Sequence, residues 1–135
     1  MVGHDGHAAS RVVLKTAIDL AEKLDAQLHI VHSVTLDDYG IDPDIEAFEE
    51  DRDRAVAAER DLITATLGAS SVPWSYHEQR GDPARGLSSF ADRVDASFII
   101  IGATHRGVLR HLTGSDSVSK RLLAQHRRPV LIVPV

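Results

Sequence analysis

Apolar positions along the chain follow two spacings, one typical of helices and the other of strands. Leu14, Ile18 and Ala21 recur at helical spacing and predict a helix over Ala9–Leu24 that buries one face. A longer helix is predicted from about residue 48 to Gly68, whose flexible backbone suits a helix C-terminus.

Two further helices are predicted in the second half of the chain. Asp82–Pro83 places a side-chain acceptor before a proline, which favours the first turn of a helix. Leu87 and Phe90 begin the apolar stripe of that helix. A short helix is predicted over Ser117–Gln125.

Short apolar and β-branched runs between these helices predict strands. The predicted strands are Met1–His4, Gln27–Val34, Val72–Gln79, Ala96–Ile101 and Pro129–Val135. Pro73 lacks an N–H and places the start of its strand, or the whole strand, at a sheet edge, whereas the unbroken apolar run before Gly102 indicates a central strand. The first strand is short for a central position, so either the natural chain starts upstream of Met1 or the strand is truncated.

Strands that alternate with helices indicate right-handed crossovers and a mainly parallel sheet covered on both faces. The 135 residues suffice for one ordinary core and are too few for two domains, so we expect a single domain over residues 1–135. The sequence has no cysteine, which excludes disulfides and thiolate catalysis.

The formal net charge of −5 argues against a nucleic-acid binder, which needs a basic surface. Nine acids and one base between Asp37 and Asp53 indicate a solvated loop and helix face. From Gly102 onward six bases stand against one acid, so an anionic ligand would be drawn there. No apolar run approaches the ~20 residues of a membrane span and no signal peptide is visible, so we expect a cytoplasmic protein without a membrane segment.

Several short motifs stand in a fixed order along nearly the whole chain. They are Val2–Gly6 with Ser10, Leu28–His32, Gly81–Ala84, Ile99–Gly102, Ser117–Ser119 and Pro129–Val133. In this order and spacing they resemble the universal stress proteins. The resemblance implies a doubly wound, five-stranded parallel sheet in the order 3-2-1-4-5 with four helices, a Rossmann-like fold of the adenine nucleotide α-hydrolase type. It also implies a stress-response module that binds ATP.

The same resemblance implies where the nucleotide would lie. Asp5 would contact the nucleoside, with backbone groups of Gly3 and Ser33 beside the adenine. Phosphates would meet a glycine loop of the pattern G-x2-G-x9-G-S/T and the helix after it. The implied site residues are Gly3, Asp5, Ser33, Ile101, Gly102, His105, Arg106, Gly114, Ser115, Asp116, Ser117 and Val118.

The glycine loop departs from that pattern at two positions. Gly102 matches the first glycine, and His105 replaces the second. Counting back from Pro129 puts Asp116 at the third glycine, with Ser117 as its hydroxyl, unless a shifted loop uses Gly114–Ser115. A helix N-terminus favours an anion by about 0.3 to 2 kcal/mol, whereas a carboxylate about 4 Å from a phosphate charge costs about 4 kcal/mol at an effective dielectric of 20. ATP is therefore expected to need Mg²⁺ between Asp116 and the phosphates.

Two interpretations stay open for each of the acidic site residues. Either Asp116 faces a nucleotide, or the glycines only turn the chain and Asp116 caps the short helix. Asp5 contacts a ligand, caps the first helix, or does both.

The sequence offers no general base or nucleophile beside the loop, which favours a regulatory module over an enzyme. A slow ATP hydrolase and a nucleotide-free member that acts through unknown protein partners remain alternatives. No metal site is predicted, because His29 and His32 point to opposite faces of a strand and no metal-binding spacing occurs.

The last predicted strand, Pro129–Val135, is apolar on both faces. Such an edge favours aggregation unless it is covered. Antiparallel pairing of two copies covers both edges under two-fold symmetry, and the resemblance implies the same arrangement. We expect a homodimer through this strand.

Overall fold

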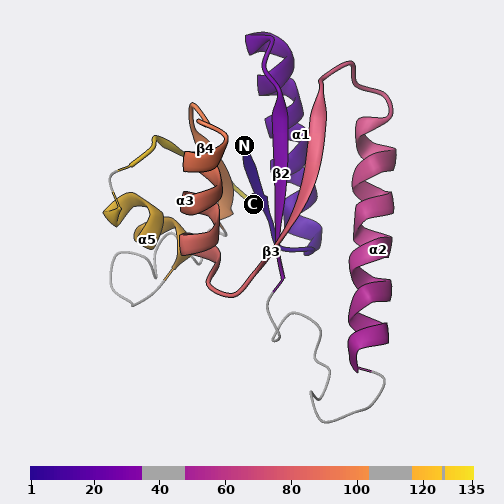
Figure 1. Cartoon of the computed structure of the whole chain (residues 1–135). Coiled ribbons are helices and arrows are strands. Elements are labelled where there is room, and N and C mark those ends of the chain that lie inside the picture. The colour runs from indigo at the N-terminus through magenta and orange to yellow at the C-terminus, as the bar shows by residue number, and fades with distance from the viewer. Residues whose placement is uncertain (35–47, 104–116, 126) are drawn as a thin grey trace.

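The computed structural model of the chain describes residues 1–34, 48–103, 117–125 and 127–135. Within these residues five parallel strands form one sheet in the spatial order β3-β2-β1-β4-β5 (Figure 1). The strands are β1 (Val2–His4), β2 (Leu28–Val34), β3 (Trp74–Arg80), β4 (Ile99–Ala103) and β5 (Val130–Pro134). The α/β class, the strand order and the two predicted edge strands are confirmed.

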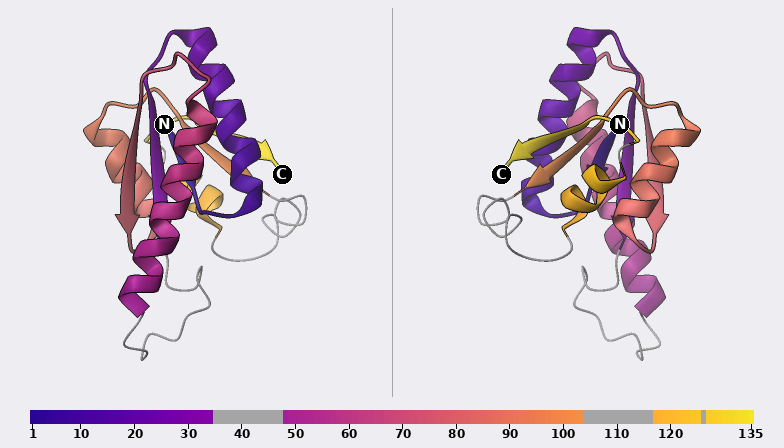
Figure 2. Two further views of the ribbon diagram at one scale, coloured as in Figure 1. Left: turned by 90° about the vertical axis from the view of Figure 1, so that its right-hand side faces the viewer. Right: turned by 90° about the vertical axis from the view of Figure 1, so that its left-hand side faces the viewer.

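Helices cover both faces of this sheet. On one face lie α1 (Ala8–Leu24) and α2 (Phe48–Leu67), and on the other α3 (Pro83–Arg93) and α5 (Val118–Ala124). Figure 2 shows α2 in front of the sheet from one side and α5 in front from the other. Among the described residues, no helix combines the length and the apolar character needed to cross a membrane.

The buried core has two parts, one on each face of the sheet. Successive strand residues point to opposite faces. Ile30 and Ile100 pack with α1 and α2, whereas Val31 and Ile101 pack with α3 and α5. This double burial explains why the central strands appear in the sequence as continuous apolar runs.

The central strand β1 is short, as the sequence predicts, and with three residues it is one residue shorter than the predicted Met1–His4. It pairs with β2 along its whole length, but its register with β4 is the single pair Val2 and Ile100. The space beyond this pair, toward the carboxyl ends of the two strands, holds the pocket described below.

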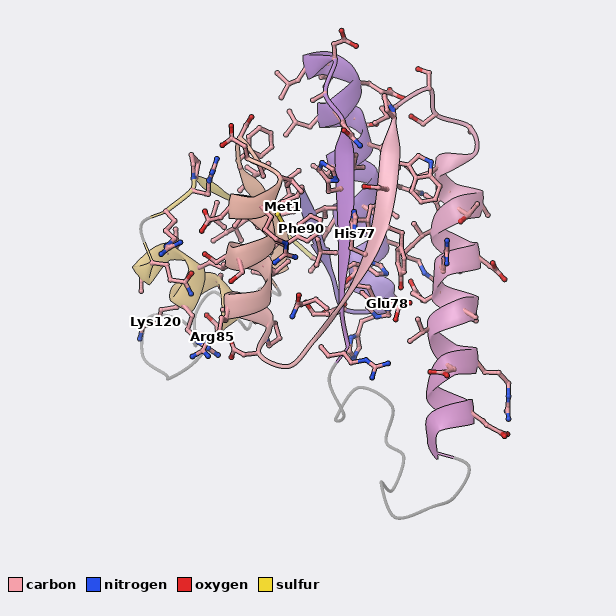
Figure 3. The ribbon with its side chains drawn as sticks, in the orientation of Figure 1. Met1, His77, Glu78, Arg85, Phe90 and Lys120 are labelled. Carbon is pink, nitrogen blue, oxygen red and sulfur yellow. The ribbon has the colours of Figure 1, made fainter. Side chains whose placement is uncertain are left out.

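A polar and aromatic cluster joins the edge strand β3 to its neighbours. Ser75 Oγ lies 2.8 Å from His29 Nδ1 of β2 and 2.8 Å from His77 Nε2 of β3. The rings of His77 and Phe90 of α3 are 4.4 Å apart between centroids, and Figure 3 shows these two side chains beside each other. The side chains of His29 and His32 lie on opposite faces of the sheet, as predicted. His29 contacts Ser75, whereas His32 bonds Tyr76, which packs against the core on the other face.

Helix α3 begins as the sequence predicts. Asp82 is its N-cap, and the carboxylate Oδ1 accepts a hydrogen bond from the backbone N–H of Arg85 at 2.8 Å. The next strand begins at Ile99, three residues later than predicted. Ala96 still belongs to the helix end, because its N–H donates to the carbonyl of Ala91 after Asp95 adopts a left-handed conformation with φ of 48°.

Both capping alternatives for the acidic residues are corrected by the structure. The N-cap of α5 is Ser117, whose Oγ accepts from the backbone N–H of Lys120 at 3.2 Å, so the prediction that Asp116 caps this helix is wrong. The N-cap of α1 is His7, which makes no side-chain capping bond. Asp5 is therefore not the helix cap, although it does organise the loop before the helix.

Candidate functional site

A pocket of about 330 Å³ opens where the carboxyl ends of β1 and β4 part. This is the point at which the strand order reverses, and open parallel sheets bind ligands there. The pocket is lined by Gly3, His4, Asp5, Ala9, Ser10, Val13, Ser33, Pro83, Leu87, Ile101, Gly102, Val118 and Val135.

Six residues predicted from the resemblance come together in this pocket. They are Gly3, Asp5, Ser33, Ile101, Gly102 and Val118. Ser117 does not line the pocket, and its hydroxyl serves as the α5 cap. The remaining predicted residues lie outside the described part of the chain: His105, Arg106, Gly114, Ser115 and Asp116.

Asp5 is held by its own loop at the mouth of the pocket. Its Oδ1 accepts hydrogen bonds from the backbone N–H of His7 at 3.1 Å and from the hydroxyl of Ser10. Partial burial raises the pKa of the Asp5 carboxyl, but these two bonds and the neighbouring histidines outweigh burial and lower the pKa below its usual 3.8. Asp5 is therefore a fixed carboxylate at neutral pH, suited to accept hydrogen bonds from ligand hydroxyls.

Close packing explains why glycine stands at two positions of the pocket wall, Gly3 and Gly102, in addition to their predicted binding role. A Cβ on Gly3 would lie 3.1 Å from Leu87, and a Cβ on Gly102 would lie 2.8 Å from Val13 Cγ2. The sequence predicts Gly102 as the first glycine of the phosphate loop and as a residue near the nucleoside. The structure adds that α1 itself occupies the space next to this backbone.

A buried histidine lies behind Asp5. His4 is 3% exposed, and its Nε2 lies 2.6 Å from the Glu59 carboxylate of α2. The ring of His4 meets the ring of His32 edge to face at 5.7 Å. Sequence reasoning did not find this contact, because Glu59 is 55 residues away and stands on an exposed helical pattern.

The pocket combines apolar walls with a few polar groups. Leu87, Pro83 and Val118 offer apolar surface, whereas Asp5 and Ser33 offer hydrogen-bonding side chains. This mixture suits a flat apolar ring that carries hydroxyl groups. Within the described ranges no group of three or more His, Asp or Glu side chains could hold a metal ion.

The fold and the pocket together define a doubly wound α/β domain with a ligand site at its switch point. The family model described as the universal stress protein family matches residues 1–134. The chain belongs to this family, as its motifs predicted. It is 30% identical over 162 residues to the stress response protein NhaX of Bacillus subtilis (strain 168), an alignment that covers 98% of this chain and 95% of that protein.

Solved structures of the family share the fold. A universal stress protein in complex with cAMP has a TM-score of 0.69 at 21% identity, over 98% of this chain and 93% of that one. The universal stress protein from Archaeoglobus fulgidus in complex with dAMP has a TM-score of 0.62 at 19% identity, over 97% of this chain and 93% of that one.

Proposed function

We propose that this protein is a stress-response module that binds an adenine nucleotide in the pocket between β1 and β4. The observation that carries the proposal is the convergence of Asp5, Ser33 and Gly102 on one pocket at the switch point. Two structural relatives, which hold cAMP and dAMP, support the same ligand class. The cytoplasmic location expected from the sequence stays a prediction.

Each part of the nucleotide has a proposed partner. The adenine lies against Pro83 and Leu87, which provide the apolar wall. The ribose hydroxyls donate to the Asp5 carboxylate, which its loop holds in place. The phosphates lie toward the first turn of α5, where the backbone N–H of Val118 points outward from the start of the helix. The Ser117 hydroxyl stays with its helix cap.

The first experiment asks whether a nucleotide is bound at all. The protein is purified, denatured, and the released small molecules are identified by mass spectrometry. We expect adenine nucleotide in near-stoichiometric amount or, if purification strips it, binding of added ATP by calorimetry. A protein that releases none and binds none would instead be a family member that acts through protein partners.

The second experiment concerns Asp116, whose carboxylate would repel phosphate unless a cation lies between them. ATP is expected to bind weakly without Mg²⁺. Asp116→Gly should tighten ATP binding and reduce its dependence on Mg²⁺. Calorimetric titration of both proteins with and without Mg²⁺ tests this, and equal affinities in all four cases would remove Asp116 from the site.

The protein is also proposed to act as a homodimer through β5. Leu131 and Ile132 are 40% and 38% exposed, and as successive residues of an edge strand they place apolar side chains on both of its faces. The described residues offer no such observation in favour of a slow ATP hydrolase.

A further inference from the structure

Two buried polar side-chain atoms have no hydrogen-bond partner among the residues that the structure describes. They are His4 Nδ1 and Ser33 Oγ, and both residues line the pocket. Buried polar groups in proteins are nearly always hydrogen-bonded, because leaving one unsatisfied is costly. Each of these two atoms therefore needs an explanation beyond the hydrogen bonds of the described residues.

The two atoms differ in the direction of their side chains. His4 points to the face covered by α1 and α2, where its other ring nitrogen, Nε2, contacts the Glu59 carboxylate. Ser33 points to the opposite face, because Val31, two residues earlier on β2, packs with α3 and α5. Ser33 is thus on the side of the sheet that carries the apolar pocket wall, and it is only 6% exposed.

The strand order places Ser33 at one end of the pocket. β2 lies on one side of β1, whereas β4 lies on the other side. Gly102 lies on β4, across β1 from Ser33, and Val118 of α5 stands where the phosphates are proposed. A nucleotide that spans β1, with its phosphates toward α5, therefore brings its base to Ser33.

We propose that the Ser33 hydroxyl makes a direct hydrogen bond to the edge of the ligand's heterocyclic base and selects for a polar atom there. This inference rests on the proposed function. It goes beyond the family resemblance, which implied only backbone groups at this residue. The hydroxyl can donate to a ring nitrogen or accept from an amino group. The site should therefore prefer a purine base with a polar edge over an apolar ring without polar atoms.

The test is a set of calorimetric titrations on Ser33→Ala and the parent. The ligands are ATP, the three ATP analogues in which N1, N3 or N7 is replaced by carbon, and purine riboside triphosphate, which lacks the 6-amino group. We expect Ser33→Ala to bind ATP about fivefold more weakly, the ordinary effect of one hydrogen bond. One of the four analogues should bind the parent more weakly than ATP by the same factor. In Ser33→Ala that analogue should bind as well as ATP, because the effects of removing two groups that contact each other are not additive.

Two controls separate a binding role from a folding role. Ser88→Ala removes a serine hydroxyl that is equally buried at 6% exposure but does not line the pocket, and it should leave ATP affinity unchanged. Without ligand, Ser33→Ala should melt at the same temperature as the parent or higher, because an unpartnered buried hydroxyl is removed.

The outcomes distinguish this inference from the proposed function. If the parent binds ATP and Ser33→Ala binds it equally well, the hydroxyl is not a contact and the inference fails alone. The inference also fails alone if Ser33→Ala is weaker but every analogue loses affinity equally in both proteins. If the parent neither releases nor binds any of these nucleotides, the proposed function fails and Ser33 as a base contact fails with it.

Discussion

At the scale of single residues, Gly102 illustrates how one position can serve both the fold and the site. A Cβ there would lie 2.8 Å from Val13 Cγ2, closer than carbon atoms normally approach. Val13 is β-branched and helical, so its side chain has little freedom to turn away. The glycine is therefore required by the packing of α1 on β4, whatever the pocket binds.

We expect Gly102→Ala to destabilise the protein by about 1 to 3 kcal/mol, the usual cost of overpacking a core. Urea unfolding of the variant and the parent measures this change. The double variant Val13→Ala with Gly102→Ala should recover part of the loss, because the smaller side chain makes room for the new methyl group. Additive losses in the double variant would show that the contact is not the cause.

At the scale of elements, the sequence predicted the helices and strands well, because each has a clear apolar spacing. It missed details that depend on contacts between distant residues. The β4 strand starts late because Ala96 closes α3 by a backbone bond to Ala91. The cap of α5 is Ser117 rather than Asp116, a choice between neighbouring acceptors that spacing alone does not make.

The pocket was predictable to a similar degree. Asp5, Ser33 and Gly102 stand at strand ends, where the topology brings them together. The apolar wall from Pro83 and Leu87 was not predicted, because Pro83 looks like an ordinary helix start and Leu87 like an ordinary part of the α3 stripe. The contact between His4 and Glu59 joins two elements that no local pattern connects.

The histidine pair between β2 and β3 makes a prediction about pH at this scale. Burial lowers the pKa of His29 below 6.5, and the neighbouring His77 lowers it further. Burial and then the charge of Arg93 lower the pKa of His77 in the same way. At these two histidines the unfolded chain therefore binds protons more readily than the folded protein. The folding stability that the neutral rings contribute above about pH 6.5 is lost as the pH falls.

We expect the melting temperature of the parent to fall between pH 7 and pH 5, and to fall less in the double variant His29→Asn with His77→Gln. Each protein serves as its own reference, since its value at pH 8 contains any loss from the missing hydrogen bonds to Ser75. The same slope in both proteins would show that other groups carry the pH dependence.

At the scale of the whole molecule, β5 is the exposed edge of the sheet and carries the C-terminus at the margin of the fold (Figure 2). Its backbone has a defined outward side. The N–H of Val135 donates to Ala103 and the carbonyl of Pro129 accepts from Ile99, so the odd-numbered residues face β4. The even-numbered residues present their N–H and C=O groups to the open edge. Pro134 has no N–H, which leaves Ile132 as the outward donor in the middle of the strand.

A two-fold dimer centred on Ile132 would let two copies exchange both backbone hydrogen bonds at this residue. Ile132→Pro removes the outward N–H without removing a bond to β4, so we expect it to be monomeric, while Ile132→Ala keeps the N–H and should remain largely dimeric. Sedimentation at micromolar concentration should give the parent twice the 14.7 kDa subunit mass. Circular dichroism should show the same helix content in all three proteins. A parent that sediments as one subunit would contradict the dimer. An Ile132→Pro variant that stays dimeric would show that the contact between copies lies elsewhere, because this substitution removes the outward donor alone.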